Sequence, residues 1–416
     1  MDNKIKKRVI FIIIFVFIYY FVGMFYPDGV VMRNRGDEPN YHVPTIKKMA
    51  TENILNAVKD YPSATFPLYH ILISPIYKLW PDDINAMRTF NLLITLITVF
   101  LLFYYYKNCN PLLSNKDSSL FAFIIALTFV FSPFVRASAL SITTDNLPYL
   151  FILIGLISLY YYDRYRRNYL IPIVVSASFL AFYTRQYYIW VPIYLFIEFI
   201  KLPATTRKSK QIYLFLSFLF TLPALYLVWV WNGFVPPYWQ HKHETTQIFM
   251  MLPFIFSFIP FYLLPIYLMF IKKKYIPKII KLILPNAILC CCFVLVYMKL
   301  SFNQTFIDGG GLCGKVLLII FHQHAALLFL VCSYLGLASI ILLITKFPRK
   351  NYIWIAALIV FIFSRIFWQK YFDPLVFFIL FLTMPLSIRE KLLKSKNIYY
   401  FPLMEIFIWA GTVLYY

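Results

Sequence analysis

Charged residues are scarce in this chain of 416 residues: they make up 13% of it, about half of the roughly 25% that is typical of soluble domains. No polar stretch is long enough to form a large soluble domain, which excludes that class of protein. Hydrophobic residues instead make up 61%, and apolar runs of about 17–25 residues, the length that crosses ~30 Å of hydrocarbon, recur from end to end. The sequence therefore predicts an all-α polytopic membrane protein with about 11–13 transmembrane helices.

The candidate spans lie between charged or proline-rich breaks. They are residues 8–26, 87–106, 118–135, 146–163, 168–183, 186–201, 212–231, 248–271, 279–299, 322–345, 350–368, 371–387 and 399–416. Together they form one polytopic domain, residues 1–416.

Acidic residues are few as well, 17 against 39 Lys and Arg, which gives a formal net charge of +22. A nucleic-acid partner is not expected, because no basic, aromatic-interleaved soluble face exists to bind it. We interpret the excess as cytoplasmic loops that set orientation and contact anionic lipid. The six cysteines show no metal-ligand spacing, and we expect neither a metal nor another cofactor.

The orientation follows from the loops. Four basic residues precede the first apolar run and no small-residue cleavage site follows it, so we expect a retained helix with a cytoplasmic N-terminus. Alternate loops are then basic, as the positive-inside rule requires, and most acidic residues fall on the far side. The longest far-side loop, residues 27–86, contains residues 40–58, in which we expect an amphipathic helix lying at the membrane interface.

Two acidic sites stand at far-side ends of spans. Asp37 and Glu38, followed by His42, suit general acid/base chemistry on a lipid-linked substrate; alternatively, the two acids cap the helix that follows. Asp145 could position a substrate hydroxyl, or Thr144 or Asp145 could be the N-cap of the next span.

Cationic residues mark three further far-side sites. Arg185, followed by Gln186, has no acidic neighbour in sequence and needs a counter-charge, which a phosphate would supply; alternatively, its side chain reaches the interface. Arg365 and Lys370 form either a second phosphate clamp or an interfacial anchor. His243 and Glu244 could bind a diphosphate or a sugar. A secondary transporter would instead place ionisable groups near the bilayer midplane, so an enzyme is favoured.

In chain order these segments resemble the dolichyl-phosphate-glucose-dependent α-1,2-glucosyltransferases of the GT-C superfamily. The matching segments are Asp37-Glu38 with His42-Val43-Pro44, Thr65-Phe66-Pro67-Leu68-Tyr69, Arg88-Thr89-Phe90-Asn91-Leu92-Leu93, Thr144-Asp145, Arg185-Gln186, Asn232-Gly233 with His243-Glu244, and Lys370-Tyr371-Phe372. The chain departs from the family pattern by one extra residue between Glu38 and His42, and by Lys370 where Arg is usual.

The resemblance implies a GT-C fold and inverting transfer of glucose from a polyprenyl (dolichyl) phosphate to a lipid-linked oligosaccharide, in protein N-glycosylation. Asp37 is then the expected base, with Glu38 as the alternative, and Arg185 with Lys370 or Arg365 holds the donor phosphate. The expected substrate-binding residues are His42, Asp145, Gln186, His243 and Glu244. The membrane would be the endoplasmic reticulum in a eukaryote or the cell membrane in a bacterium. The alternatives are a related transferase for mannose or another sugar, and a lipid or glycan transporter.

Overall fold

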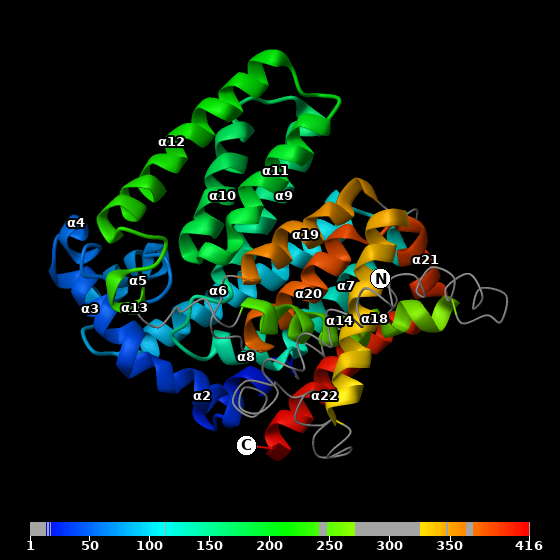
Figure 1. The fold of residues 1–416 in the computed structure, drawn as a ribbon, viewed down its shortest axis with the longest axis horizontal. Coiled ribbons are helices and arrows are strands. Elements are labelled where there is room, and N and C mark those ends of the chain that lie inside the picture. The colour runs from blue at the N-terminus through cyan, green and yellow to red at the C-terminus, as the bar shows by residue number, and fades with distance from the viewer. Residues whose placement is uncertain are drawn as a thin grey trace.

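The computed structural model of the chain describes residues 14, 16, 18–112, 114–240, 248–270, 325–346, 348–362 and 369–415. Every regular element within these residues is a helix (Figure 1). The first half contains α2 (Gly29–Asp37), η1 (Glu38–His42), α3 (Val43–Thr51), α4 (Ile54–Ala57), α5 (Leu68–Leu79), α6 (Ile84–Tyr104), η2 (Tyr105–Cys109), α7 (Asn115–Phe131), α8 (Pro133–Ala139), α9 (Leu147–Tyr165), α10 (Leu170–Thr184), η3 (Gln186–Ile189) and α11 (Trp190–Lys201).

The second half continues the same architecture. It contains α12 (Arg207–Trp231), α13 (Pro237–Gln240), α14 (Ile248–Phe270), α18 (Ala325–Lys346), α19 (Pro348–Ile362), α20 (Gln369–Thr383), α21 (Leu386–Lys394), η6 (Asn397–Tyr399) and α22 (Tyr400–Tyr415). The spans predicted at residues 87–106, 146–163 and 168–183 each correspond to one helix, α6, α9 and α10, to within a few residues. The span predicted at residues 279–299 lies outside the described residues.

Local chemistry fixes where the helices near the first loop begin and end. The Asp83 carboxylate accepts hydrogen bonds from two amides of the first turn of α6, at 2.9 and 3.1 Å, and so starts that helix. Pro133 cannot continue α7, because its ring lacks an amide hydrogen, and α8 leaves Ser132 at an angle of 68°. Arg185 has an extended backbone (φ −150°, ψ 134°), which separates α10 from η3.

Within the described part of the chain, two helices, taken over residues Ile84–Cys109 and Arg207–Trp231, are long and apolar enough to cross a membrane, and the bent pair α7–α8 would be a third if it forms one span. Both of these helices expose large apolar side chains at helical spacing to the outside. These are Leu93, Leu96, Ile97 and Phe100 on α6, and Leu214, Phe215, Phe218, Leu222, Leu225 and Trp229 on α12. Continuous apolar faces of this kind suit lipid rather than water, and the chain is accordingly an α-helical protein of membrane character.

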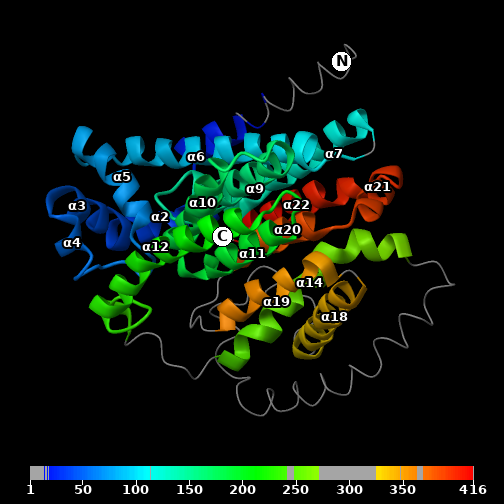
Figure 2. The same cartoon turned by 90° about the horizontal axis from the view of Figure 1, so that it is seen from above.

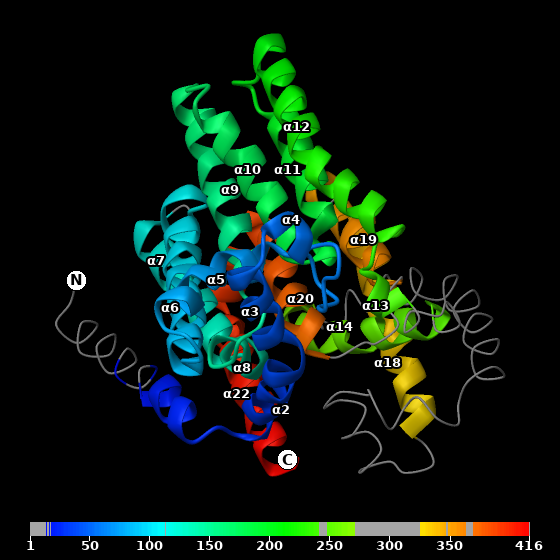
Figure 3. The ribbon, with the colours of Figure 1, turned by 90° about the vertical axis from the view of Figure 1, so that its left-hand side faces the viewer.

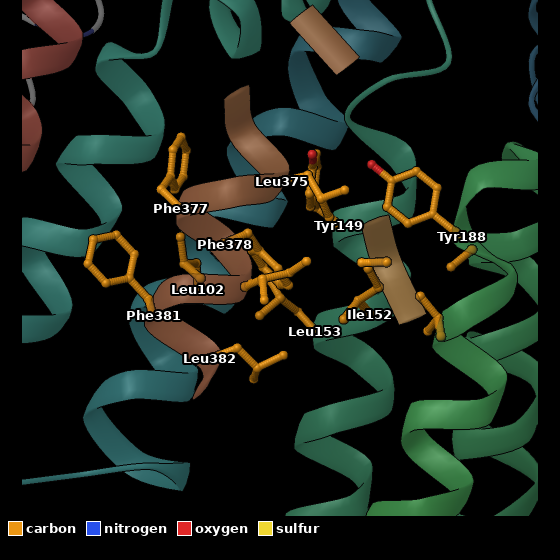
Figure 4. Packing of buried hydrophobic residues seen from close by; sticks show 14 of the residues in the cluster. Leu102, Tyr149, Ile152, Leu153, Tyr188, Leu375, Phe377, Phe378, Phe381 and Leu382 are labelled. Atoms are coloured by element: carbon orange, nitrogen blue, oxygen red, sulfur yellow. The ribbon is translucent and has the colours of Figure 1, made fainter. Parts of the chain in front are cut away.

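The core between the helices is rich in aromatic rings. In Figure 4, Phe378 and Leu382 of α20 lie toward Leu153 and Ile152 of α9, whereas Phe377 and Phe381 lie on the opposite side of α20. Tyr149 of α9 packs against both α20 and η3, since its ring centroid lies 5.2 Å from that of Phe378 and 5.9 Å from that of Tyr188. This packing holds α9, and with it the turn that precedes α9, in a fixed position.

The first loop is folded onto the bundle at one end. Figure 2 shows α3, α4 and α5 gathered beside the start of α6, and Figure 3 looks onto this side, with α2 below α3 and α4 above it. Asp28 anchors the start of α2: its carboxylate accepts from Val31 N at 3.1 Å, from Trp409 Nε1 at 3.0 Å, and from the buried Arg136 guanidinium of α8.

The amphipathic helix expected over residues 40–58 is interrupted. α3 ends at Thr51 and α4 begins at Ile54, after Asn53 caps it through a hydrogen bond to Leu55 N at 2.9 Å. Ile46 of α3 is fully buried in a cluster with residues of α5, whereas Ile54 is half exposed. The apolar face of this segment therefore packs mainly against the protein itself, because α5 supplies an apolar partner that the sequence pattern alone does not reveal.

Candidate functional site

The two adjacent acids lie where α2 passes into a π-helical turn. Asp37 is the last residue of α2, and Glu38 opens η1, in which the Val43 amide bonds to the Glu38 carbonyl five residues earlier. A π-turn holds one more residue than an α-turn, and such turns are frequent at functional sites.

Glu38 is locked in place. Its side chain is 2% exposed and pairs with Arg88 of α6, which donates from Nε to Oε1 at 3.1 Å and from Nη2 to Oε2 at 2.5 Å. The Ile142 amide donates to Oε1 at 2.8 Å. Glu38 thereby ties η1 to α6 and to the turn that precedes α9.

Asp37 has a different environment. Asp37 is partly exposed, and its side chain makes no capping hydrogen bond to η1. The capping hydrogen bond that the alternative interpretation expects is absent: Asp37 stands at the N-cap position of η1 without one, and Glu38, in the first turn of η1, is held by Arg88. Of the two carboxylates, Asp37 is the one that a solute can approach.

Asp145 and Arg185 form a largely buried ion pair, with side chains 11% and 12% exposed, although they are 40 residues apart in sequence. Ser138 donates a further hydrogen bond to Asp145 Oδ2 at 3.2 Å. The N-cap of α9 is Asn146, without a side-chain capping bond, so Asp145 is not the cap that one interpretation expected. The counter-charge that Arg185 requires is Asp145, and the guanidinium also lies 5.9 Å from the ring centroid of Tyr187.

Asn91 of α6 organises the turn that carries Asp145. Its amide nitrogen donates to the carbonyl oxygens of Ser141 at 2.5 Å and Thr143 at 3.0 Å, and its amide oxygen accepts from Tyr69 Oη at 3.0 Å. One side chain thus satisfies a non-helical backbone that would otherwise carry unpaired buried carbonyls. Asn91 holds this turn beside Glu38 and α5.

Residues 61–66 of the first loop connect to two later segments. Gln186 donates from Nε2 to the Ala64 carbonyl at 3.0 Å, and the Trp239 indole donates to the Pro62 carbonyl at 2.8 Å. The Tyr41 ring of η1 lies 5.2 Å from that of Trp239. The predicted sites around residues 37–42, 145 and 185–186 are therefore neighbours in space, and Trp239, which precedes the site at His243 and Glu244, lies beside them.

His42 also lies in this assembly, but its partner was missed at the level of sequence. Its Nδ1 lies 3.0 Å from Nε2 of His70 on α5, and Nδ1 of His70 lies 2.5 Å from the Tyr61 hydroxyl. The only signal in the sequence was a second histidine in the same loop, 28 residues after the first. Burial together with the neighbouring His42 holds the pKa of His70 well below its usual value.

Four expected residues are not brought to this assembly by the described parts of the chain. His243, Glu244 and Arg365 lie outside the described residues, and Lys370 lies in the first turn of α20, where only the backbone is described. The described ranges contain no group of three or more His, Cys, Asp or Glu side chains that could hold a metal ion.

The site as described thus combines a partly exposed carboxylate, two largely buried ion pairs and a histidine pair on one loop-and-turn assembly. Comparison of the chain with family models, with curated proteins and with solved structures finds no match.

Proposed function

We propose that the protein is a GT-C-type glycosyltransferase that crosses the membrane about 11–13 times and uses a polyprenyl-phosphate sugar, with glucose as the first candidate. The observation that carries this proposal is that hydrogen bonds tie the segments carrying Asp37–His42, Asp145 and Arg185 to one another and to the folded first loop, at an end of apolar helices. A lipid-linked donor enters from the bilayer, so its phosphate and sugar must be handled at such an end.

The chemistry needs one base and one cation. Asp37 is the proposed base because it is partly exposed, whereas both oxygens of Glu38 are engaged by Arg88 and Ile142. The acceptor hydroxyl loses its proton to Asp37 and attacks the anomeric carbon, whose bond to the lipid phosphate breaks, with inversion. Arg185 is oriented by Asp145 and stabilises the charge on the departing phosphate.

The remaining assignments extend this proposal. Lys370 or Arg365 would add a second cation to the phosphate, and Gln186, His243 and Glu244 would bind sugar hydroxyls. The proposed sidedness places the assembly opposite the cytoplasmic N-terminus: in the endoplasmic reticulum lumen of a eukaryote, where the acceptor is a lipid-linked oligosaccharide for protein N-glycosylation, or outside the bacterial cell membrane.

The test uses the full chain purified in detergent with polyprenyl phosphates that carry glucose, mannose or another hexose. Release of polyprenyl phosphate with one donor identifies the sugar. Asp37→Asn should abolish release, and Asp117→Asn, a change at an acid in the first turn of α7 that is likewise partly exposed, is the matched control. Full activity of Asp37→Asn would refute the base.

A second candidate, an ion-coupled transporter of lipid or glycan, is favoured by a different observation. Asp373 of α20 and Glu405 of α22 are fully buried in apolar helices beside the bend between α7 and α8. The Ser132 hydroxyl at that bend donates to Asp373 at 3.3 Å, and buried acids at broken helices are typical of transporters. Substrate uptake into vesicles that disappears in Asp373→Asn, without any release of polyprenyl phosphate, would favour this function.

A further inference from the structure

Arg35 of α2 is a cation that the described part of the chain leaves without an acidic partner. Three other arginines around the first loop each form an ion pair with a carboxylate, namely Arg88 with Glu38, Arg136 with Asp28 and Arg185 with Asp145. Arg35 is partly exposed and donates to main-chain oxygens instead: Nη2 to the Met24 carbonyl at 2.9 Å, and both Nε and Nη2 to the Leu140 carbonyl at 3.4 Å.

The two carbonyl groups hold this guanidinium at a defined place. Met24 lies at the end of the first apolar run, residues 9–25. Leu140 follows α8, in the turn that precedes α9 and carries the partner of Arg185. In the proposed topology the end of an apolar run marks the boundary of the hydrocarbon, beyond which the polar headgroups of lipids begin. Arg35 is thus held at the depth of lipid phosphates.

The surroundings of Arg35 lack one negative charge. Arg88 and Glu38 act on it electrostatically, and they already neutralise each other. Partial burial, and then the charge of Arg88, lowers the pKa of Arg35, whereas Glu38 raises it. Arg33 and Asp37, two residues before and after Arg35, add one charge of each sign. An anion bound at Arg35 would therefore balance the local charge.

Gly36 leaves open space between Arg35 and Asp37. A Cβ atom added at Gly36 would meet no other part of the protein within 4 Å, and the residue is exposed. The opposite face of this segment is closed, because Asn34 and Glu38 are each only 2% exposed. Consecutive side chains of a helix point about 100° apart, so a ligand that contacts both Arg35 and Asp37 passes over Gly36.

We propose that Arg35 binds the phosphate of the polyprenyl-phosphate sugar at the membrane interface, and that the sugar lies over Gly36 toward Asp37. This inference rests on the proposed transferase function and adds a second cation, beside Arg185, to the donor site. A guanidinium suits this role because its N–H groups match phosphate oxygens. Neither carbonyl uses Nη1 of Arg35, so the N–H groups of that nitrogen can reach the phosphate.

Polyprenyl phosphate, which carries no sugar, tests the phosphate contact without catalysis. Its affinity is measured by titration of the full chain purified in detergent. Arg35→Met should weaken binding about tenfold or more, through the loss of a charge-assisted hydrogen bond. Arg33→Met is the matched control, because it removes the same charge from an exposed residue of α2, and it should change the affinity by about twofold. An equal loss in both variants would overturn the inference, since it would indicate a diffuse field rather than a contact.

Two further comparisons identify what is bound. Arg35→Lys keeps a point charge and should restore part of the lost affinity; no restoration would contradict an anion contact. Polyprenol, which lacks the phosphate, should bind equally well to the wild type and to Arg35→Met. Displacement of polyprenyl phosphate by equimolar phosphatidylglycerol or inorganic phosphate would show a general phosphate site and would overturn the assignment to the donor.

Gly36→Leu tests the path of the sugar in a variant that should fold. The added side chain starts in open space, and leucine favours a helix more than glycine does. It should leave the affinity for polyprenyl phosphate unchanged but lower kcat/KM for the donor about tenfold or more, because the sugar is displaced. An unchanged kcat/KM would refute the path over Gly36.

The binding and transfer measurements separate the possible failures. Sugar transfer by the wild type, with an unchanged affinity for polyprenyl phosphate in Arg35→Met, would refute the role of Arg35 alone. Binding that depends on Arg35, together with no transfer from any donor, would refute the transferase while showing that the phosphate site itself is right.

Discussion

Removal of Arg88 should destabilise the protein strongly, because it leaves the Glu38 carboxylate in a site where its side chain is only 2% exposed. Arg88→Met keeps the length of the side chain and removes both donors. Only the Ile142 amide, at 2.8 Å, would remain on that carboxylate. Loss of one partner of a buried ion pair costs about 3–5 kcal/mol, and we expect the free energy of unfolding to fall by that amount.

Glu38→Gln should cost less, about 1.5–3 kcal/mol. The amide keeps an oxygen for Ile142, and the Arg88 side chain, which is 16% exposed, can turn toward water. The double variant should be less destabilised than the sum of the two single variants, since each change removes the same contact, with a coupling of about 1–3 kcal/mol.

The assay is unfolding of the purified full chain by titration with SDS, followed by tryptophan fluorescence. Lys48→Met provides the control, because Lys48 pairs with the 47% exposed Glu52 side chain at 3.9 Å, and a pair of that kind contributes about 0–1 kcal/mol. If Arg88→Met lost no more stability than Lys48→Met, the argument that Glu38 is a structural anchor would fail.

Three further changes probe other parts of the structure by the same titration. Asn91→Ala should cost about 2–3 kcal/mol by leaving buried carbonyls unpaired, and a cost as small as that of exposed Asn40→Ala would contradict its role. In Gly336→Ala the new methyl group would collide with the Phe256 carbonyl oxygen, so α18 should separate from α14. Gly36→Ala, with nothing within 4 Å, should be neutral or stabilising, and equal stability of these two variants would count against the packing. Glu405→Gln should change stability by less than about 1 kcal/mol, because a fully buried carboxyl group beside the buried Asp373 is best kept uncharged; a large loss would indicate a charged partner.

Some residues of the candidate site could be predicted from sequence, because the signal came from their immediate neighbours in the chain. The pair Asp37-Glu38 stood out as adjacent acids after an apolar run, and Arg185 as a cation between two such runs. The absence of an acidic neighbour also indicated that Arg185 needs a counter-charge from elsewhere in the chain or from a ligand. It could not name Asp145, since a separation of 40 residues is bridged only when α9 and α10 pack side by side.

The helical class, the membrane character and the approximate bounds of helices such as α6, α9 and α10 could be predicted from sequence, because each depends on the length and composition of continuous segments. Which of the two adjacent acids is buried and which is partly exposed followed only from the packing of the helices. Arg88 of α6 and the Ile142 amide both reach Glu38 across the fold. The same is true of the contact between His42 and His70. Hydrogen bonds and ion pairs depend on distances of about 3 Å, and such distances between remote segments exist only after the helices have packed.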